Sequence, residues 1–160
     1  MTKFPISPIF IPANKLEYVD KALNSGADGI IFDLEDSVLQ EDKISARDNL
    51  YAFLVKNSLD ILSYIRINDL NTETGITDLD FFKDLDYGII IPKFESDKDF
   101  IKIPDKLSII PLIETPLAIK NLGKIASGRN VTGLAFGAAD LSSIIGSEMN
   151  WDSMLYARSK

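Results

Sequence analysis

The chain has 160 residues and a formal net charge of −7, from 17 Lys and Arg against 24 Asp and Glu. It contains no Cys and no His, so any general base must be a carboxylate, Lys, Tyr or water, and any metal site must use oxygen ligands, which favour Mg2+, Mn2+ or Ca2+. The acidic balance, without a basic cluster, argues against nucleic acid and against an anionic membrane as partners.

Short apolar runs alternate with amphipathic or polar stretches along the chain. In chain order, the pattern predicts a strand at 8–12, a helix at 14–26, a strand at 28–34, a helix at 41–57, a strand at 62–69, a short helix near 78–85, strands at 87–95 and 107–115, a helix at 116–127, a strand at 131–141 and a helix that begins near 151. Asn14 would cap the first helix and Gly26 would end it. The second helix would present one apolar face, made of Ile44, Leu50, Phe53 and Leu54.

Alternating strands and helices predict an α/β fold with a parallel sheet covered on both faces. The strand cores GIIF, GIII and SIIPLI are nearly continuous apolar runs, as strands buried on both sides require. We expect a single domain over residues 1–160. No apolar run reaches the roughly 18 residues of a membrane span, and the N-terminal stretch does not resemble a signal peptide, so we expect a cytoplasmic location.

Polar residues recur at the carboxyl ends of the predicted strands, which form the functional rim of parallel α/β folds. They are Asp33, Glu35 and Asp36; Arg66, Asn68 and Asp69; Lys93 and Glu95; Glu114 and Thr115; and Gly137 and Asp140.

Structural explanations exist for four of these acids. Asp33 can be a turn residue or a helix cap, and Asp36 or Ser37 can cap the following helix. Glu114 can complement the dipole of the helix that begins at Pro116, and Asp140 can cap the helix after it.

Arg66, between Ile65 and Ile67, can form a buried ion pair with Glu35 or Glu114. Lys93 can form a salt bridge with Glu95 or another acid of the rim, or can serve as a Schiff-base lysine.

Five motifs in a fixed order extend over roughly residues 8–159: FDLEDSV, IRIND, IIPKFES, PLIETPLAI and LAFGAADLSSIIG. Together they resemble the HpcH/HpaI aldolase and citrate lyase β-subunit family, and within it the citrate lyase β-subunit and malyl-CoA lyase branch. The resemblance implies a TIM (β/α)8-type barrel. This chain supplies about six β/α units, so we expect the barrel to be incomplete.

The resemblance implies Mg2+-dependent carbon–carbon cleavage or formation, through an enolate, in a hydroxy- or oxo-acid or its CoA thioester; Mn2+ could replace Mg2+. It makes Glu114 and Asp140 the two metal ligands. Arg66 would bind substrate oxygen and stabilise the developing enolate, and Glu35 and Asp36 would hold metal-bound water.

The resemblance also places Phe136, Gly137 and Thr115 in the substrate pocket, with backbone N–H groups of the first two as donors. It implies a homo-oligomer whose neighbouring subunit can supply the acid or base. Two departures favour a free oxo-acid over a CoA thioester: FPISPIF, with Lys3 as the nearby cation, replaces a basic opening, and Ala13 replaces a Gly after the first strand.

Two other functions are consistent with the same residues. The chain could be a non-catalytic partial barrel that binds a metal or an oxo-acid, or a subunit of a larger lyase complex. A Schiff-base aldolase that uses Lys93 would not need a metal.

Overall fold

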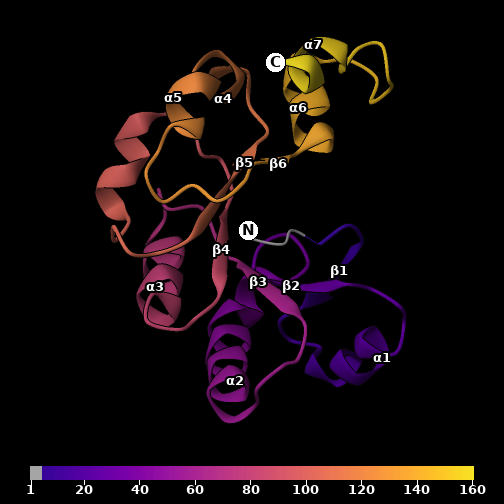
Figure 1. Cartoon of the computed structure of the whole chain (residues 1–160), viewed down its shortest axis with the longest axis vertical. Helices are drawn as coiled ribbons and strands as arrows, with labels where there is room; N and C mark the ends of the chain where they lie inside the picture. The colour runs from indigo at the N-terminus through magenta and orange to yellow at the C-terminus, as the bar shows by residue number, and fades with distance from the viewer. Residues whose placement is uncertain (1–4) are drawn as a thin grey trace. The chain divides into compact units, whose positions relative to one another are not determined.

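The computed structural model describes residues 5–160, so Lys3 lies outside the described residues. The chain divides into two compact units, residues 1–89 and 90–160, and the single domain that we expected stays a prediction (Figure 1). The first unit contains β1 (Pro8–Pro12), η1 (Leu16–Tyr18), α1 (Val19–Leu23), β2 (Gly29–Asp33), η2 (Gln40–Asp42), α2 (Lys43–Lys56), β3 (Leu62–Arg66) and α3 (Glu73–Phe82). The boundary falls within β4 (Gly88–Ile91).

Three parallel strands form the sheet of the first unit, in the order β1-β2-β3. The central strand, β2, is buried at all five positions, which explains its unbroken apolar sequence. The register aligns the last residues of the three strands, Pro12, Asp33 and Arg66, in one row. The sheet thus brings the carboxyl ends of β2 and β3, with their charged residues, next to each other.

Helices α2 and α3 pack against each other through Tyr51, whose ring meets Phe81 edge-on at a centroid distance of 5.6 Å. Leu50 and Leu54 are buried, as the sequence predicts, but Ile44 is 65% exposed, so the predicted apolar face is wrong at that position. The buried face is shifted because Ala46, Leu50 and Leu54 recur at the i, i+4 spacing of one helix face.

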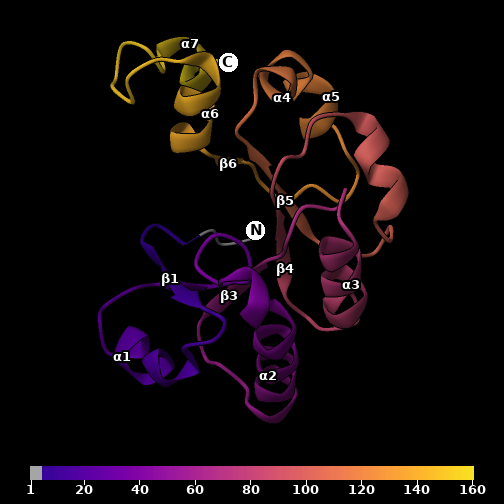
Figure 2. The same ribbon diagram turned by 180° about the vertical axis from the view of Figure 1, so that it is seen from behind.

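The second unit contains η3 (Asp97–Lys102), β5 (Ile109–Ile113), α4 (Pro116–Lys120), α5 (Leu122–Ala126), β6 (Ala135–Phe136), α6 (Ala138–Ile145) and α7 (Leu155–Ser159), which Figure 2 shows from behind. β5 is buried at all five positions and pairs in parallel with β6, with Ile113 opposite Phe136. As in the first unit, polar residues follow the ends of the paired strands.

Several predicted element bounds are wrong for local reasons. The strand at 131–141 is reduced to Ala135–Phe136, because α6 already begins at Ala138. The helix at 116–127 is divided at Asn121 into α4 and α5. α3 begins at Glu73 rather than near 78, because the Thr72 hydroxyl accepts a hydrogen bond from the Gly75 N–H and caps it.

The first helix also differs from its prediction. It consists of η1 and α1, and Lys15 rather than Asn14 occupies the N-cap position. Gly26, at φ +84°, supplies the left-handed turn that follows the helix. η3 was not predicted; Ser96 and Asp99 begin it with a capping box. Within residues 5–160, none of the helices combines the length and apolar character that a membrane span needs.

Candidate functional site

The first unit holds a cluster of one cation and three acids at the ends of β2 and β3, which we call the Arg66 cluster: Arg66, Asp33, Glu35 and Asp36. The Arg66 Nε and Nη2 donate to Asp33 Oδ1 and Oδ2, each at 2.7 Å. Arg66 Nη1 lies 3.3 Å from Glu35 Oε2 and 3.2 Å from Asp36 Oδ2. The structure therefore brings together all three residues predicted as catalytic, with Asp33 as an additional member.

Asp33 is the principal partner of Arg66, whereas the sequence suggested Glu35 or Glu114. Its carboxylate is 1% exposed, and it also accepts hydrogen bonds from the Glu35 N–H at 3.0 Å and the Ser37 N–H at 3.1 Å. Asp33 is thus the turn residue that we considered and an ion-pair partner at once. Neither Asp36 nor Ser37 caps a helix, because Leu39 and Asp42 are the N-cap residues that follow.

Burial and charge act in opposite directions on this ion pair. Burial alone would raise the pKa of Asp33, but the hydrogen bonds from Arg66 and Ser37 and the charge of Arg66 hold the pKa below its ordinary value. Burial would likewise lower the pKa of Arg66, and its hydrogen bonds to Asp33 together with the nearby acids raise that pKa instead. The pair is therefore ionised at neutral pH.

The Arg66 guanidinium has five N–H donors. Two of them, one on Nε and one on Nη2, donate to Asp33, and Nη1 lies at ion-pair distance from Glu35 and Asp36. Phe10 of β1 lies against the guanidinium, with its ring centroid 5.2 Å from Cζ. Nη2 carries a second hydrogen besides the one that it donates to Asp33.

The second unit holds a pair of carboxylates, Glu114 and Asp140. Glu114 follows β5 directly and is 2% exposed, and its Oε1 accepts a hydrogen bond of 2.7 Å from the Lys93 N–H. Lys93 has a φ of +51°, a left-handed conformation that turns its backbone N–H toward Glu114. Asp140 lies in the first turn of α6, whose N-cap is Gly137, so the predicted capping role of Asp140 is wrong.

The two carboxyl groups are close enough to affect each other's ionisation. Burial, together with the hydrogen bond and charge of Asp140, raises the pKa of Glu114 to about 7, against the opposite effect of the Lys93 N–H and charge. Two adjacent acids of which one is buried favour a shared proton or a cation between them. Among residues 5–160 no group of three acids forms a ready metal site, so the protein would contribute this pair, and water and substrate would complete the coordination.

Gly137 leaves the space that the Glu114 side chain occupies. A Cβ at this position would lie 2.6 Å from Glu114 Cβ and 2.8 Å from Glu114 Oε2. The Gly137 N–H donates to the Ile113 carbonyl at 3.0 Å within the sheet, so it is not available as the substrate donor that we predicted. The role of Gly137 in this structure is steric.

We expect Gly137→Ala to displace Glu114, to destabilise the fold by about 1–3 kcal/mol and to weaken Mg2+ binding by about tenfold or more. Isothermal titration with Mg2+ and urea unfolding measure the two effects. Gly123→Ala is the matched control, because a Cβ at Gly123 in α5 meets nothing within 4 Å. That control should leave Mg2+ binding unchanged. Equal Mg2+ affinity in the two variants would contradict the steric role of Gly137.

Thr115 and Lys93 both lie next to residues of the acid pair in the chain or in space. Thr115 is the N-cap of α4, and its Oγ1 accepts a hydrogen bond from the Ala118 N–H at 3.1 Å, which leaves the hydroxyl hydrogen to donate. The Lys93 side chain is exposed. A Schiff-base lysine is usually desolvated to lower its pKa, so this exposure favours the metal-dependent alternative.

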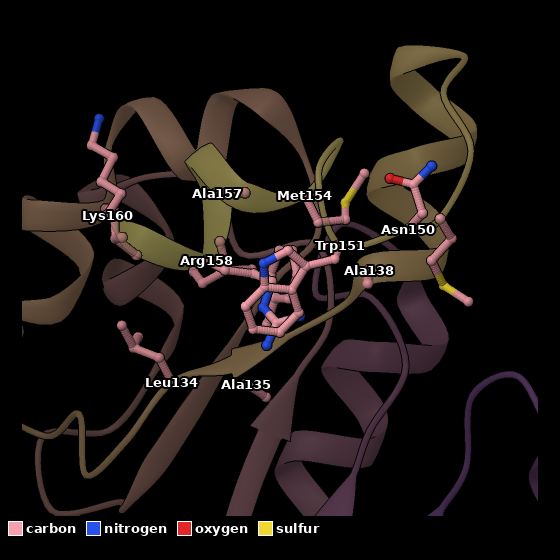
Figure 3. A pocket seen from close by; sticks show the side chains of 13 residues that line it. Leu134, Ala135, Ala138, Asn150, Trp151, Met154, Ala157, Arg158 and Lys160 are labelled. Carbon is pink, nitrogen blue, oxygen red and sulfur yellow. The ribbon is translucent and has the colours of Figure 1, made fainter.

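Phe136 lines an apolar cavity of about 640 Å³ in the second unit (Figure 3). Trp151, Met154 and Arg158 also line it, and the Arg158 guanidinium lies 3.8 Å from the centroid of the Trp151 ring. Because side chains alternate along a strand, Phe136 points toward this cavity while Gly137 faces Glu114. The Phe136 side chain therefore lies away from the acid pair, and only its backbone could contribute there.

Sequence reasoning missed two groups that organise the Arg66 cluster. Asp33 belongs to the acidic stretch DLED, and the missing information was the strand register that places it opposite Arg66. Lys43 donates hydrogen bonds to the Leu34 and Glu35 carbonyls and to Asn68. No pattern in the sequence indicates those contacts.

Comparison with known proteins gives a consistent result. The family model described as HpcH/HpaI aldolase/citrate lyase matches residues 7–160. A (3S)-malyl-CoA thioesterase of Cereibacter sphaeroides (strain ATCC 17025 / ATH 2.4.3) is 34% identical over 158 residues, which cover 92% of this chain and 54% of the relative. The chain therefore spans about half the length of this curated relative.

Two solved structures from Mycobacterium tuberculosis are also similar. The citrate lyase β subunit complexed with oxaloacetate and magnesium has a TM-score of 0.82 at 28% identity, over 95% of this chain and 70% of that one. CitE in complex with magnesium, acetoacetate and coenzyme A has a TM-score of 0.76 at 31% identity, over 88% and 51%. These matches confirm the predicted fold class: six strands in chain order alternate with helices as an incomplete TIM-type barrel.

Proposed function

Because the chain belongs to the HpcH/HpaI aldolase/citrate lyase family, we propose that it acts in Mg2+-dependent carbon–carbon cleavage of a hydroxy- or oxo-acid, or of its CoA thioester, through an enolate. The similar structures contain magnesium with oxaloacetate, or with acetoacetate and coenzyme A, which supports both the metal and the substrate class. The chain spans about half of its curated relative, so activity is proposed for the protein to which these residues contribute.

The observation that carries the proposal is the Glu114–Asp140 pair. A buried carboxylate whose pKa is raised to about 7 beside a second acid is poorly compensated without a cation. Mg2+ commonly binds one or two carboxylates and completes an octahedron with water and substrate oxygens, so this donor set fits Mg2+, and Mn2+ as well. Glu114 and Asp140 would hold the ion, which supplies positive charge to the substrate oxygens when it is bound.

Arg66 is the residue that we propose to bind the substrate. Its guanidinium does not deprotonate, and Asp33 fixes it with two hydrogen bonds, so it is a preorganised positive charge. The remaining Nη2 hydrogen would donate to the oxygen on which enolate charge develops. Glu35 and Asp36, which face Nη1, would hold ordered water.

Thr115, Phe136 and Gly137 are the residues of the second unit that we propose to contact the substrate. The hydroxyl hydrogen of Thr115 would donate to a substrate carboxylate, since its oxygen is occupied by the Ala118 N–H. Phe136 would contribute its backbone N–H, and Gly137 would provide space.

A coupled assay tests the proposal. The protein is incubated with malyl-CoA, citryl-CoA or the free acids, and the release of glyoxylate from malyl or of oxaloacetate from citryl substrates is followed with Mg2+ and with EDTA. Turnover should require Mg2+ and should be lost in Asp140→Asn, while Asp152→Asn, an exposed control, should retain it. Undiminished release in EDTA would contradict the metal-dependent mechanism and favour a Schiff-base mechanism that uses Lys93. In that case borohydride, added with pyruvate, would trap the Schiff base on Lys93.

A second candidate is hydrolysis of the CoA thioester, since the curated relative is named a (3S)-malyl-CoA thioesterase. Malyl-CoA distinguishes the two reactions, because hydrolysis consumes water and releases malate and free CoA thiol, whereas carbon–carbon cleavage releases glyoxylate and acetyl-CoA. A thiol reagent and a glyoxylate assay on the same sample therefore assign the reaction.

A non-catalytic module is the third possibility, and the length of the chain relative to its relatives favours testing it. Calorimetry that detects binding of Mg2+ and oxaloacetate without turnover would support this module. We retain a homo-oligomer and a cytoplasmic location as predictions.

A further inference from the structure

Lys43, the first residue of α2, uses its whole ammonium group inside the first unit. Its Nζ donates to the Leu34 carbonyl at 2.9 Å, to the Glu35 carbonyl at 2.8 Å and to Asn68 Oδ1 at 2.6 Å. An ammonium has three donors, so each one has an acceptor. Burial also lowers the pKa of Lys43, against the opposite effect of Asp78, Glu35, Asp33 and Asp36. The Lys43 ammonium is therefore hydrogen-bonded to protein acceptors.

The carbonyls that Lys43 binds belong to the turn that presents the acids to Arg66. The Asp33 carboxylate holds this turn by its N–H groups, at Glu35 and Ser37. Lys43 holds the same turn by its carbonyls, at Leu34 and Glu35. The backbone from 34 to 37 is therefore fixed by an anion at its donors and by a cation at its acceptors.

Asn68 lies two residues after Arg66, the last residue of β3, and it connects β3 to this turn. Its Nδ2 donates to the Leu34 carbonyl at 3.0 Å and to Asp78 Oδ2 at 2.7 Å, while its Oδ1 accepts from Lys43. Asp78, which is fully buried, also accepts from the Asn68 N–H at 3.0 Å. Lys43 and Asn68 thus join the end of β2 to the end of β3 from beneath the Arg66 cluster.

We propose that Lys43 is a positioning residue that holds the 34–36 turn so that Glu35 and Asp36 face Arg66. None of its three hydrogen bonds is to Arg66 or to an acid side chain: it acts through the Leu34 and Glu35 carbonyls and the Asn68 amide oxygen. Without the ammonium, two carbonyls and one amide oxygen lose a charged donor, and Asp33 and Asn68 are left to hold the turn. The inference depends on the proposed function in one respect, the binding of substrate by Arg66.

The test uses nuclear magnetic resonance of the full chain and does not depend on turnover. In Lys43→Met, we expect the Arg66 Nε–H and the Glu35 and Ser37 amide signals to shift, and the two amides to exchange with solvent about tenfold faster or more. Lys56→Met, an exposed position at the other end of α2, should leave these signals as in the wild type. A lower melting temperature in Lys43→Met with unchanged signals would overturn the proposal, since Lys43 would then only stabilise the fold.

If Lys43→Met does not fold, the same resonance signals can be measured in Lys43→Gln, because the amide retains donors for one or two of the three acceptors. We expect intermediate signal shifts in this variant, and wild-type signals would overturn the proposal. In protein that turns over a substrate, Lys43→Met should lower kcat while Mg2+ affinity is retained. If the wild type shows no turnover, the proposed function fails, while the resonance measurements still decide the role of Lys43.

Discussion

Glu114→Gln should weaken Mg2+ binding by about a hundredfold or more and abolish metal-dependent turnover. Glutamine retains the size of the side chain and an oxygen that can accept the Lys93 N–H, but it removes one of the two negative charges that would hold the ion. Loss of a group that merely supports a ligand costs about 10- to 100-fold in metal affinity, so loss of a ligand should cost at least as much. Titration calorimetry with Mg2+ measures the effect, and Glu17→Gln, at an exposed position of the first unit, is the control.

The same substitution should change how stability depends on pH. The pKa of Glu114 is raised from its ordinary value of 4.5 to about 7, so the folded protein binds this proton more tightly than the unfolded chain does. The Glu114 contribution therefore decreases as pH rises from about 4.5 to about 7, and at pH 8 the ionised side chain destabilises the apo protein by about 3 kcal/mol. Bound Mg2+ should offset this penalty, because it stabilises the ionised form.

Urea unfolding at pH 5 and pH 8, with and without Mg2+, tests this linkage. Without metal, Glu114→Gln should be more stable than the wild type at pH 8, and the difference should diminish toward pH 5. Mg2+ should stabilise the wild type at pH 8 and have little effect on the variant. A wild-type stability that does not change between the two pH values would contradict the raised pKa of Glu114.

The position of the charged residues could be predicted because a parallel sheet places the carboxyl ends of its strands in one row. Asp33 and Arg66 are the last residues of β2 and β3, and Glu114 follows a strand that is buried throughout. The apolar periodicity also identified β1 at its correct bounds, Pro8–Pro12. These features depend on local sequence and on the general geometry of α/β folds.

Other features depend on contacts that the sequence does not encode locally. The apolar pattern of LAFGAADL fits a strand as well as a helix, so it does not show where β6 ends. In the structure β6 ends directly before Gly137, which lies close to Glu114. From the sequence alone, Lys43 resembles an ordinary solvent-exposed residue near the start of a helix. Only the structure shows that its ammonium donates to carbonyls of the 34–37 turn. The pairing of Arg66 with Asp33 required the register between β2 and β3, which strand composition does not determine.

Asp33→Asn should destabilise the fold by about 2 kcal/mol at neutral pH and should also lower turnover. Removing one partner of a buried ion pair typically costs about 3–5 kcal/mol, and the loss is smaller here because Glu35 and Asp36 still face Arg66 Nη1. Asn keeps one acceptor oxygen and replaces the other with an NH2 donor, so the guanidinium would lose one of the two hydrogen bonds that fix its plane, and its second Nη2 hydrogen would no longer have a defined direction. Asp36→Asn is the matched control: that side chain is 67% exposed, and its loss should cost less than about 1 kcal/mol.

The pH dependence separates the ion pair from a packing effect. The pKa of Asp33 is held below its ordinary value of 3.8, so its carboxylate stabilises the fold above that value, and the contribution is lost as pH falls through the lower folded pKa. The unfolding free energies of wild type and Asp33→Asn should therefore differ most at neutral pH and converge in acid. If the difference in unfolding free energy stayed constant down to pH 2, Asp33 would contribute to stability through its shape and not through its charge.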